Sequence, residues 1–186
     1  DSAASAITLT ANAGTVGSGG TVELAAKAAT GDISFGGGVG AFTASARGGT
    51  TSGNGGTITA TAGRNISSPG AGGSISVAPF GGNSNGGNIT LSAGNAAPGI
   101  VSIGSALIAN GSGSGTGGNI VVEYNDPTAS NANRFVIGGA PGTSGGVLGV
   151  VAATGGATGA GGNITFRNRD GVTGNDLDLF QDLRGT

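Results

Sequence analysis

Short stretches of alternating apolar and polar residues recur along the chain, each behind a pair of glycines. The clearest copies are GGTVELAA from Gly19, GGTITATA from Gly55, GGSISVAP from Gly72, GGNITLSA from Gly86, GGNIVVEY from Gly117 and GGNITFRN from Gly161. A period of two is typical of a β-strand with one buried face, and a Gly-Gly pair marks a turn. The pattern predicts one strand-and-turn unit repeated along the chain.

The alternation also assigns the two faces of each strand. Ile89 and Leu91 fall on one face, and Asn88 and Thr90 fall on the other. Because the inward positions hold small and medium-sized aliphatic residues, we expect a thin core with no room for a ligand cavity.

The spacing of the units predicts the architecture. From Ile7 to Ile164 the apolar anchors recur about every sixteen residues. We therefore predict an all-β, single-domain parallel β-solenoid of about eleven coils of about sixteen residues each. Residues 1–168 would form the solenoid and residues 169–186 a charged C-terminal cap.

Glycine supplies 44 of the 186 residues, which raises the alternative of a flexible linker. The fixed phase of the apolar residues argues against a linker. We expect the glycines to provide the positive φ angles of sharp bends, because glycine reaches them without steric cost.

Residues 124–134, YNDPTASNANR, interrupt the repeat and contain the only tyrosine. An Asp-Pro pair and several asparagines predict a polar loop. Two interpretations are open, a plain surface excursion or a ligand-binding loop that uses Tyr124, Asn125, Asp126 and Arg134.

The second interruption is the charged C-terminal end. Leu177 and Phe180 follow a helical spacing, with Asn175 or Asp176 as a suitable N-cap residue. We expect a cap here, because a solenoid end exposes an open strand edge. The strand-like SAITLTA near the other end offers no comparable cover, so Ile7 and Leu9 are expected to lie on an assembly edge, with Leu177 and Phe180 at the opposite end.

The sequence holds few residues for catalysis. It has no His or Cys and a single lysine, Lys27, so nothing predicts an activated nucleophile or a thiolate or imidazole metal site. Two carboxylates, Glu23 and Glu123, are expected to occupy corresponding outward positions several coils apart, too far apart for glycoside hydrolysis. We expect no enzyme activity, no catalytic residues and no cofactor.

The C-terminal end contains a candidate calcium site. GVTGNDLDL from Gly171 partly resembles the calcium-binding nonapeptide of toxin repeats, which would use Asp170, Asp176 and Asp178. Asp178 stands where an aliphatic residue belongs and no second copy follows, so a solvated cap is favoured.

The charge balance limits the partners. Seven basic and nine acidic residues give a net charge of -2, which does not favour nucleic acid or an anionic membrane. No apolar run has the length of a membrane span. Columns of outward Thr, Ser and Asn residues could either suit ice binding or simply reflect strand propensity on a solvated face.

The GGNITLSAG and GGTITATAG units resemble the repeats of filamentous-haemagglutinin-like exoproteins and related bacterial surface adhesins. The resemblance covers most of residues 5–168 and implies a secreted right-handed β-helix at the cell surface. The sequence lacks the family's N-terminal secretion domain, so the resemblance does not extend to the export route.

Two functional hypotheses follow. The first is a non-catalytic extracellular structural protein, a homo-oligomer or filament joined through the solenoid ends. The second is an adhesin module that recognises a carbohydrate or protein ligand, with ice binding as a further alternative.

Overall fold

The described part of the chain is built from parallel β-strands. The computed structural model describes residues 7–35, 42–68, 70–129, 133–139 and 145–170, and the backbone of 177–179. These residues contain no helix, and therefore none long and apolar enough to span a membrane. The predicted all-β class and the parallel β-solenoid are confirmed.

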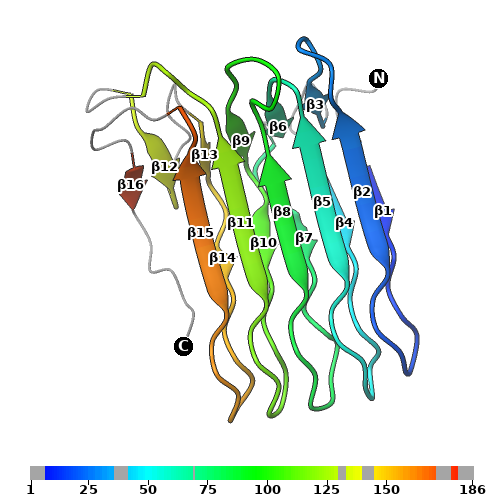
Figure 1. The fold of residues 1–186 in the computed structure, drawn as a ribbon. Coiled ribbons are helices and arrows are strands. Elements are labelled where there is room, and N and C mark those ends of the chain that lie inside the picture. The colour runs from blue at the N-terminus through cyan, green and yellow to red at the C-terminus, as the bar shows by residue number, and fades with distance from the viewer. Residues whose placement is uncertain are drawn as a thin grey trace.

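Three parallel sheets make up the solenoid, and the chain visits them in turn (Figure 1). Sheet 1 consists of β1 (Ile7–Thr10), β4 (Phe42–Ser45), β7 (Ser74–Ser76), β10 (Ala106–Ile108) and β14 (Val151–Ala152). Sheet 2 consists of β2 (Thr21–Ala26), β5 (Thr57–Ala62), β8 (Asn88–Ser92), β11 (Asn119–Tyr124) and β15 (Asn163–Asn168). Sheet 3 contains, in spatial order, β3 (Ile33–Ser34), β6 (Ile66–Ser68), β9 (Val101–Ile103), β13 (Gly146–Val147), β12 (Phe135–Ile137) and β16 (Leu177–Leu179).

One turn of the solenoid is about twice as long as predicted. Ile58, Ile89 and Ile120 pair in register on neighbouring strands of sheet 2, so the partners are 31 residues apart. The anchor between the first two, Ile75, lies on β7 of sheet 1. The prediction of eleven coils of sixteen residues is wrong, because each turn contains one strand from each of three sheets and the apolar anchors lie on more than one of them. Three regular turns, β1–β3, β4–β6 and β7–β9, are followed by a less regular region.

The irregularity lies in sheet 3. After β11 the chain passes to β12 at the fifth position of the sheet and then returns to β13 at the fourth. The register runs from Ile103 on β9 to Val147 on β13 and on to Ile137 on β12. This excursion gives sheet 3 six strands, one more than either other sheet, and places β16 beyond the last strands of sheets 1 and 2 (Figure 1).

The core is a set of apolar ladders between the sheets. Ile89 and Leu91 of β8 are buried, as the alternation predicts, and their neighbours Ile58 and Ala60 on β5 are buried too. Aromatic pairs connect the sheet 3 side of the core to sheets 1 and 2, with ring centroids 3.6 Å apart for Phe35–Phe42 and 4.6 Å apart for Tyr124–Phe135. Dispersion and apolar burial within these ladders stabilise each turn against the next.

The glycine pairs that precede the sheet 2 strands have a different physical role from the one predicted, whereas Gly72 and Gly73, which precede β7 of sheet 1, have the predicted positive φ. A Cβ added to Gly87 would lie 2.0 Å from the carbonyl oxygen of Gly56 in the previous turn, and one on Gly118 would lie 1.9 Å from that of Gly87. Neither residue has a positive φ. Positive φ does occur at other glycines, including Gly53 and Gly82 in the loops. At the start of the sheet 2 strands, glycine is therefore needed for close approach rather than for a bend.

Close approach also holds the two layers of one turn together. Gly87 donates its N–H to the carbonyl of Val77 at 3.0 Å, and Gly118 donates to Ala109 at 2.7 Å. These bonds join the segment that leaves sheet 1 to the segment that begins sheet 2. Beyond them the loops extend at the bottom of Figure 1.

The predicted helical spacing at the C-terminal end is wrong for residues 177–179. They form β16, whose Leu177 and Leu179 pair with Phe135 and Ile137 of β12. This short segment continues the ladder of sheet 3, so a tertiary pairing decides its conformation. The predicted C-terminal cap is not supported; Phe180 and the rest of that region lie outside the described residues.

Candidate functional site

The two ends of the solenoid leave strand edges without a neighbouring strand in the described structure. β1, β2 and β3 form one edge, and β14, β15 and β16 form the other. Ile7 is 39% exposed and Leu9 is half-buried on β1. Both predicted residues of the first end thus lie on an edge strand, whereas of the opposite pair only the backbone position of Leu177, on the edge strand β16, is described.

Apolar side chains that belong to the core are only partly covered at these ends. Val22 and Leu24 on β2 are half-buried, as are Ile164 and Phe166 on β15. On β11, the inward Ile120 is fully buried. The terminal turns therefore leave apolar ladder positions open to another turn of the same kind.

The hydrogen-bonding groups of the two edges of sheet 2 are complementary. Thr57 donates its N–H to the carbonyl of Gly20, and Gly63 donates to Ala26, so the even-numbered residues of β2 face β5. Since the direction alternates along a strand, the N–H and C=O groups of Thr21, Glu23 and Ala25 face the open edge.

On β15 the alternation is the opposite. Asn163 donates its N–H to Gly118, and Arg169 donates to Tyr124, so odd-numbered residues face β11. The even-numbered residues Ile164 and Phe166 therefore present their backbone groups to the open edge. This edge has the hydrogen-bonding phase that a further strand like β2 requires.

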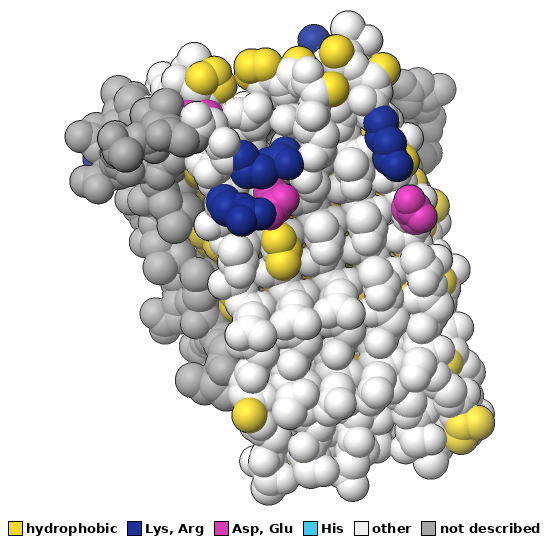
Figure 2. Space-filling model, in the orientation of Figure 1, with side chains coloured by type: hydrophobic (Ala, Val, Ile, Leu, Met, Phe, Trp, Pro, Cys, Tyr) yellow, Lys and Arg dark blue, Asp and Glu magenta, His cyan; other side chains and the backbone are white. Residues whose placement is uncertain are grey.

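A cluster of charges lies on the outer face of sheet 2 near the carboxyl ends of its strands (Figure 2). Arg167 of β15 forms an ion pair with Glu123 of β11, and Arg169 lies 3.9 Å from the other carboxylate oxygen of Glu123. Arg169 also donates to the side chain of Asn95 at 2.9 Å and to the carbonyl of Ala93. Arg167 therefore bridges neighbouring strands, and Arg169 reaches past β11 to the segment that follows β8.

The expected match between Glu23 and Glu123 is wrong. The ladder of sheet 2 aligns Glu23 with Val121, and it aligns Glu123 with Ala25. The two carboxylates thus differ in both turn and row, and they form no catalytic pair.

An ion pair connects the first and second turns in sheet 3. Asp32 accepts hydrogen bonds from the side chain of Arg64 and from the N–H of Asn65, the latter at 2.9 Å. The guanidinium of Arg64, followed by this backbone N–H, lowers the pKa of Asp32 to about 2. Asp32 in turn raises the pKa of Arg64.

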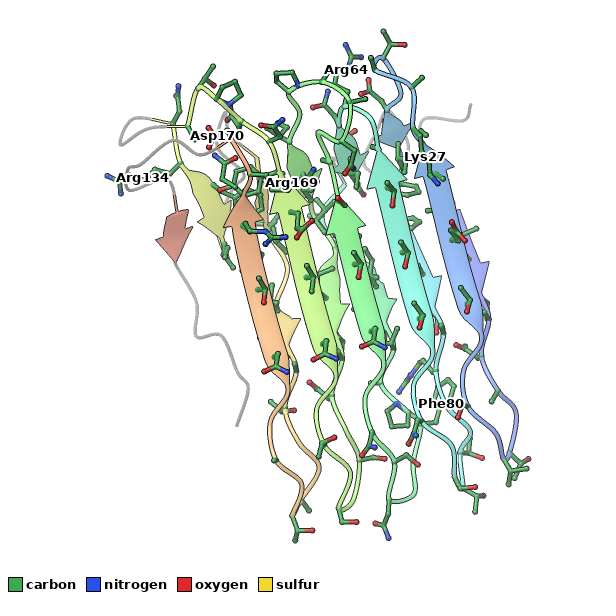
Figure 3. All side chains as sticks on the ribbon, in the orientation of Figure 1. Lys27, Arg64, Phe80, Arg134, Arg169 and Asp170 are labelled. Atoms are coloured by element: carbon green, nitrogen blue, oxygen red, sulfur yellow. The ribbon has the colours of Figure 1, made fainter. Side chains whose placement is uncertain are left out.

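A second arginine packs in the lower half of the molecule. Arg47 lies over the ring of Phe80, 3.7 Å from its centroid, and donates to the carbonyl of Ala78 at 2.9 Å. Burial lowers the pKa of Arg47. Phe80 remains 45% exposed (Figure 3), so this contact lies at the surface.

The outer face of sheet 2 carries in-register rows of polar side chains. One row contains Asn88, Asn119 and Asn163, whose amides form successive hydrogen bonds of 2.8 and 2.9 Å. A neighbouring row contains Thr59 and Thr90. Figure 2 shows no charged side chain on the lower part of this face. These rows confirm the predicted outward columns, although Glu23 of β2 and Val121 of β11 interrupt the row of Thr59 and Thr90.

The predicted ligand loop is partly in the core. Tyr124 ends β11 and is buried against Phe135, and Asp126 is also buried. Asp126 accepts hydrogen bonds from the N–H and the hydroxyl of Thr128 at 2.9 and 2.7 Å. The backbone of Asn125 exchanges two hydrogen bonds with Gly99.

These contacts leave few of the predicted loop residues for a ligand. Tyr124 and Asp126 are not accessible, and Asn125 belongs to the pairing between turns. The fourth residue, Arg134, is half-buried beside β12, with its side chain directed away from the sheets (Figure 3).

The calcium hypothesis finds no assembled site in the described part of the chain. There, no group of three or more His, Cys, Asp or Glu residues could hold a metal ion. Asp170 follows β15, Asp178 is described only as a backbone position in β16, and Asp176 lies outside the described residues.

The sheets, ladders and open edges define a β-solenoid, a fold typical of β-helix repeat proteins. Comparison with protein-family models, with curated proteins and with solved structures gave no match. The resemblance to filamentous-haemagglutinin-like repeats therefore rests on the repeat pattern alone.

Proposed function

We propose that this protein is a non-catalytic structural subunit that joins end to end into a fibre or stalk outside the cell. The observation that carries the proposal is the complementary phase of the open β2 and β15 edges. The extracellular setting comes from the resemblance of the repeats to those of secreted surface proteins.

A second copy can continue sheet 2 in the register of the existing ladder. β15 pairs with β11 over six residues, and β2 of the next copy would pair with β15 in the same way. Asn163 would then face Thr21, and Ile164 would face Val22. Such a ladder contributes about 5 kcal/mol, given a net value of about 1 kcal/mol per backbone hydrogen bond.

Apolar burial adds to this joint. Covering Val22, Leu24, Ile164 and Phe166, which are already half-buried, contributes about 4 kcal/mol. Association itself costs about 4–15 kcal/mol. The ladder and the apolar contacts are therefore both needed, and joining should require a high protein concentration.

The charges near the joint nearly cancel. In the continued register, Arg167 would lie diagonally next to Glu23 of the next copy, which is favourable, whereas Arg169 would face Lys27 of that copy, which is not. The backbone ladder, rather than charge, would set the register.

A proline on the open edge tests the proposal. Glu23→Pro removes an N–H that faces solvent in the single copy but would pair in the joint, so the fold should survive while joining is lost. The control Glu23→Thr keeps the N–H and introduces the residue found at the aligned position of β5.

The readouts are sedimentation velocity over a range of concentrations and electron microscopy. We expect rods of constant width from the natural chain and from Glu23→Thr, and only single particles from Glu23→Pro. Rods from Glu23→Pro would contradict the proposed joint, and single particles from the natural chain at every concentration would contradict the function.

A second candidate is ice binding by the outer face of sheet 2. The observation that favours it is the row of asparagines beside Thr59 and Thr90, with about 4.8 Å between strands and about 6.6 Å between alternate residues of a parallel sheet. Thr90→Lys should abolish thermal hysteresis, whereas Thr43→Lys on the outer face of sheet 1 should not. A natural chain without hysteresis would eliminate this candidate.

A further inference from the structure

The sixth strand of sheet 3 occupies a position that end-to-end joining needs. β14 and β15 are the fifth strands of sheets 1 and 2, whereas sheet 3 has β12 at its fifth position and β16 at its sixth. The step arises because the chain visits β12 before returning to β13. It makes the ends unequal, since β1, β2 and β3 are each the first strand of their sheet.

A joining copy would bring three edge strands together. Its β1 and β2 would become the sixth strands of sheets 1 and 2, as the proposed function requires. Its β3 would then become the sixth strand of sheet 3, and β16 is already there. Two strands cannot pair with β12 on the same side, so the complete joint and the paired β16 exclude each other.

We propose that β16 is a displaceable strand that controls joining: a second copy completes the joint only when its β3 replaces β16 beside β12. This inference rests on the proposed end-to-end function and names the partner surface as the first turn of a second copy. The excursion of the chain through β12 and back to β13 then has a consequence for assembly: without this excursion, sheet 3 would end level with sheets 1 and 2, and β16 would not block the incoming β3.

The lengths of the competing strands suit such an exchange. β16 pairs with β12 over three residues, and β3 pairs with β6 over two in the described structure. Sheet 3 alone therefore gives the incoming strand no advantage over β16. The advantage comes from sheets 1 and 2, where β1 spans four residues and β2 spans six. Displacement of β16 is then driven by pairing elsewhere in the joint.

A reversible cross-link can hold β16 in place. Val136 and Asp178 are in-register partners on β12 and β16, and neighbouring Cα atoms of a parallel ladder lie about 4.8 Å apart, within the range of a disulfide. The chain has no cysteine of its own, so Val136→Cys with Asp178→Cys creates one defined pair. Reduction of the same sample provides the matched control.

A truncated variant tests the opposite state. Removing residues 171–186 takes away β16 and should lower the concentration at which rods form by about ten- to a hundredfold, the factor that corresponds to two backbone hydrogen bonds. The oxidised double-cysteine variant should stay as single particles at concentrations where its reduced form assembles. Formation of the disulfide is followed by intact mass and by loss of free thiols.

The outcomes separate the inference from the function on which it rests. Rods formed equally by the natural, truncated and oxidised chains would refute control by β16 and leave end-to-end joining intact. Single particles from the truncated chain at every concentration would refute end-to-end joining itself. Failure of the disulfide to form would contradict the pairing of β12 with β16.

Discussion

Replacing Gly87 with alanine tests the close-approach role of the glycine pairs. The new Cβ would lie 2.0 Å from the carbonyl oxygen of Gly56 and 2.7 Å from the carbonyl carbon of Gly55. Nonbonded carbon contacts are comfortable at about 3.5–4.0 Å. The start of β8 must therefore move away from the previous turn by more than 1 Å, roughly the difference between these distances.

The size of the effect follows from the hydrogen bonds at this position. Gly56 accepts from the N–H of Asn88 at 2.9 Å, and Gly87 donates to Val77 at 3.0 Å. Breaking two such bonds costs about 2–6 kcal/mol, because their partners are left unsatisfied between the layers. Alanine also restricts the unfolded chain more than glycine does, and this lower entropy of the unfolded state offsets about 0.4–1 kcal/mol of the loss. We expect the free energy of unfolding to fall by about 1–5 kcal/mol.

Gly14→Ala is the matched control. A Cβ at Gly14 would meet nothing within 4 Å, and its φ is not positive. Its stability should match the natural chain or exceed it by up to about 1 kcal/mol.

Urea unfolding followed by far-ultraviolet circular dichroism and by the fluorescence of the single tyrosine measures both variants. Gly87→Asn separates the two roles of glycine: a positive-φ role would tolerate asparagine, whereas close approach would not. Stability of Gly87→Ala within about 0.5 kcal/mol of the natural chain would refute the steric reasoning.

Three further predictions concern single contacts. The pKa of Asp32 is lowered to about 2, so the ion pair of Asp32 with Arg64 stabilises the fold at pH values above the ordinary pKa of an aspartate, and this stabilisation is lost as the pH falls from about 4 to about 2. The urea midpoint of the natural chain should therefore fall over that pH range, and Asp32→Asn should make this fall smaller. An equally steep fall in the variant would contradict the prediction. Tyr124→Ala removes a buried ring stacked on Phe135 and should lower the free energy of unfolding by about 3–5 kcal/mol in urea, so a loss below about 1 kcal/mol would place the ring outside the core. Asn119→Ala removes two exposed side-chain hydrogen bonds in the asparagine row and should lower the free energy of unfolding by about 1 kcal/mol in the same assay. Unaltered stability would show that the row contributes nothing to the stability of the fold.

The sequence was sufficient to predict the faces of the strands. Ile89 and Leu91 point inward and the residues between them point outward, because period-two alternation follows directly from strand geometry. The same rule could have placed Tyr124 in the core, since it continues the inward phase of Ile120 and Val122. Its polar neighbours obscured that signal.

The length of the turn could not be obtained from the same pattern. Gly72 and Gly73 precede β7 in sheet 1, and Gly86 and Gly87 precede β8 in sheet 2. The two strands look alike in sequence although they lie in different sheets. The period depends on which strand pairs with which, and that choice is made by tertiary structure rather than by local alternation.

The order of the strands in sheet 3 could not be predicted from the sequence either. β12 and β13 contribute only three and two residues, too few to fix a position in a ladder. Their neighbours decide it: β13 continues the row of Ile103 through Val147, and the buried Phe135 on β12 stacks on Tyr124. The candidate joint depends on this strand order. The sequence therefore could not predict that sheet 3 extends one strand beyond sheets 1 and 2 at this end of the solenoid.

Assembly and folding stability should be coupled in this architecture. In a solenoid each turn is stabilised mainly by its neighbours, so a terminal turn has one stabilising interface where an inner turn has two. The partial exposure of Val22, Leu24, Ile164 and Phe166 is the structural expression of that difference, and it makes the terminal turns the first to open. Joining converts two terminal turns into inner ones. The segments that open most readily in the single copy are therefore those that the joint stabilises most, and exchange of β16 for β3 needs only the local opening that such an end already permits.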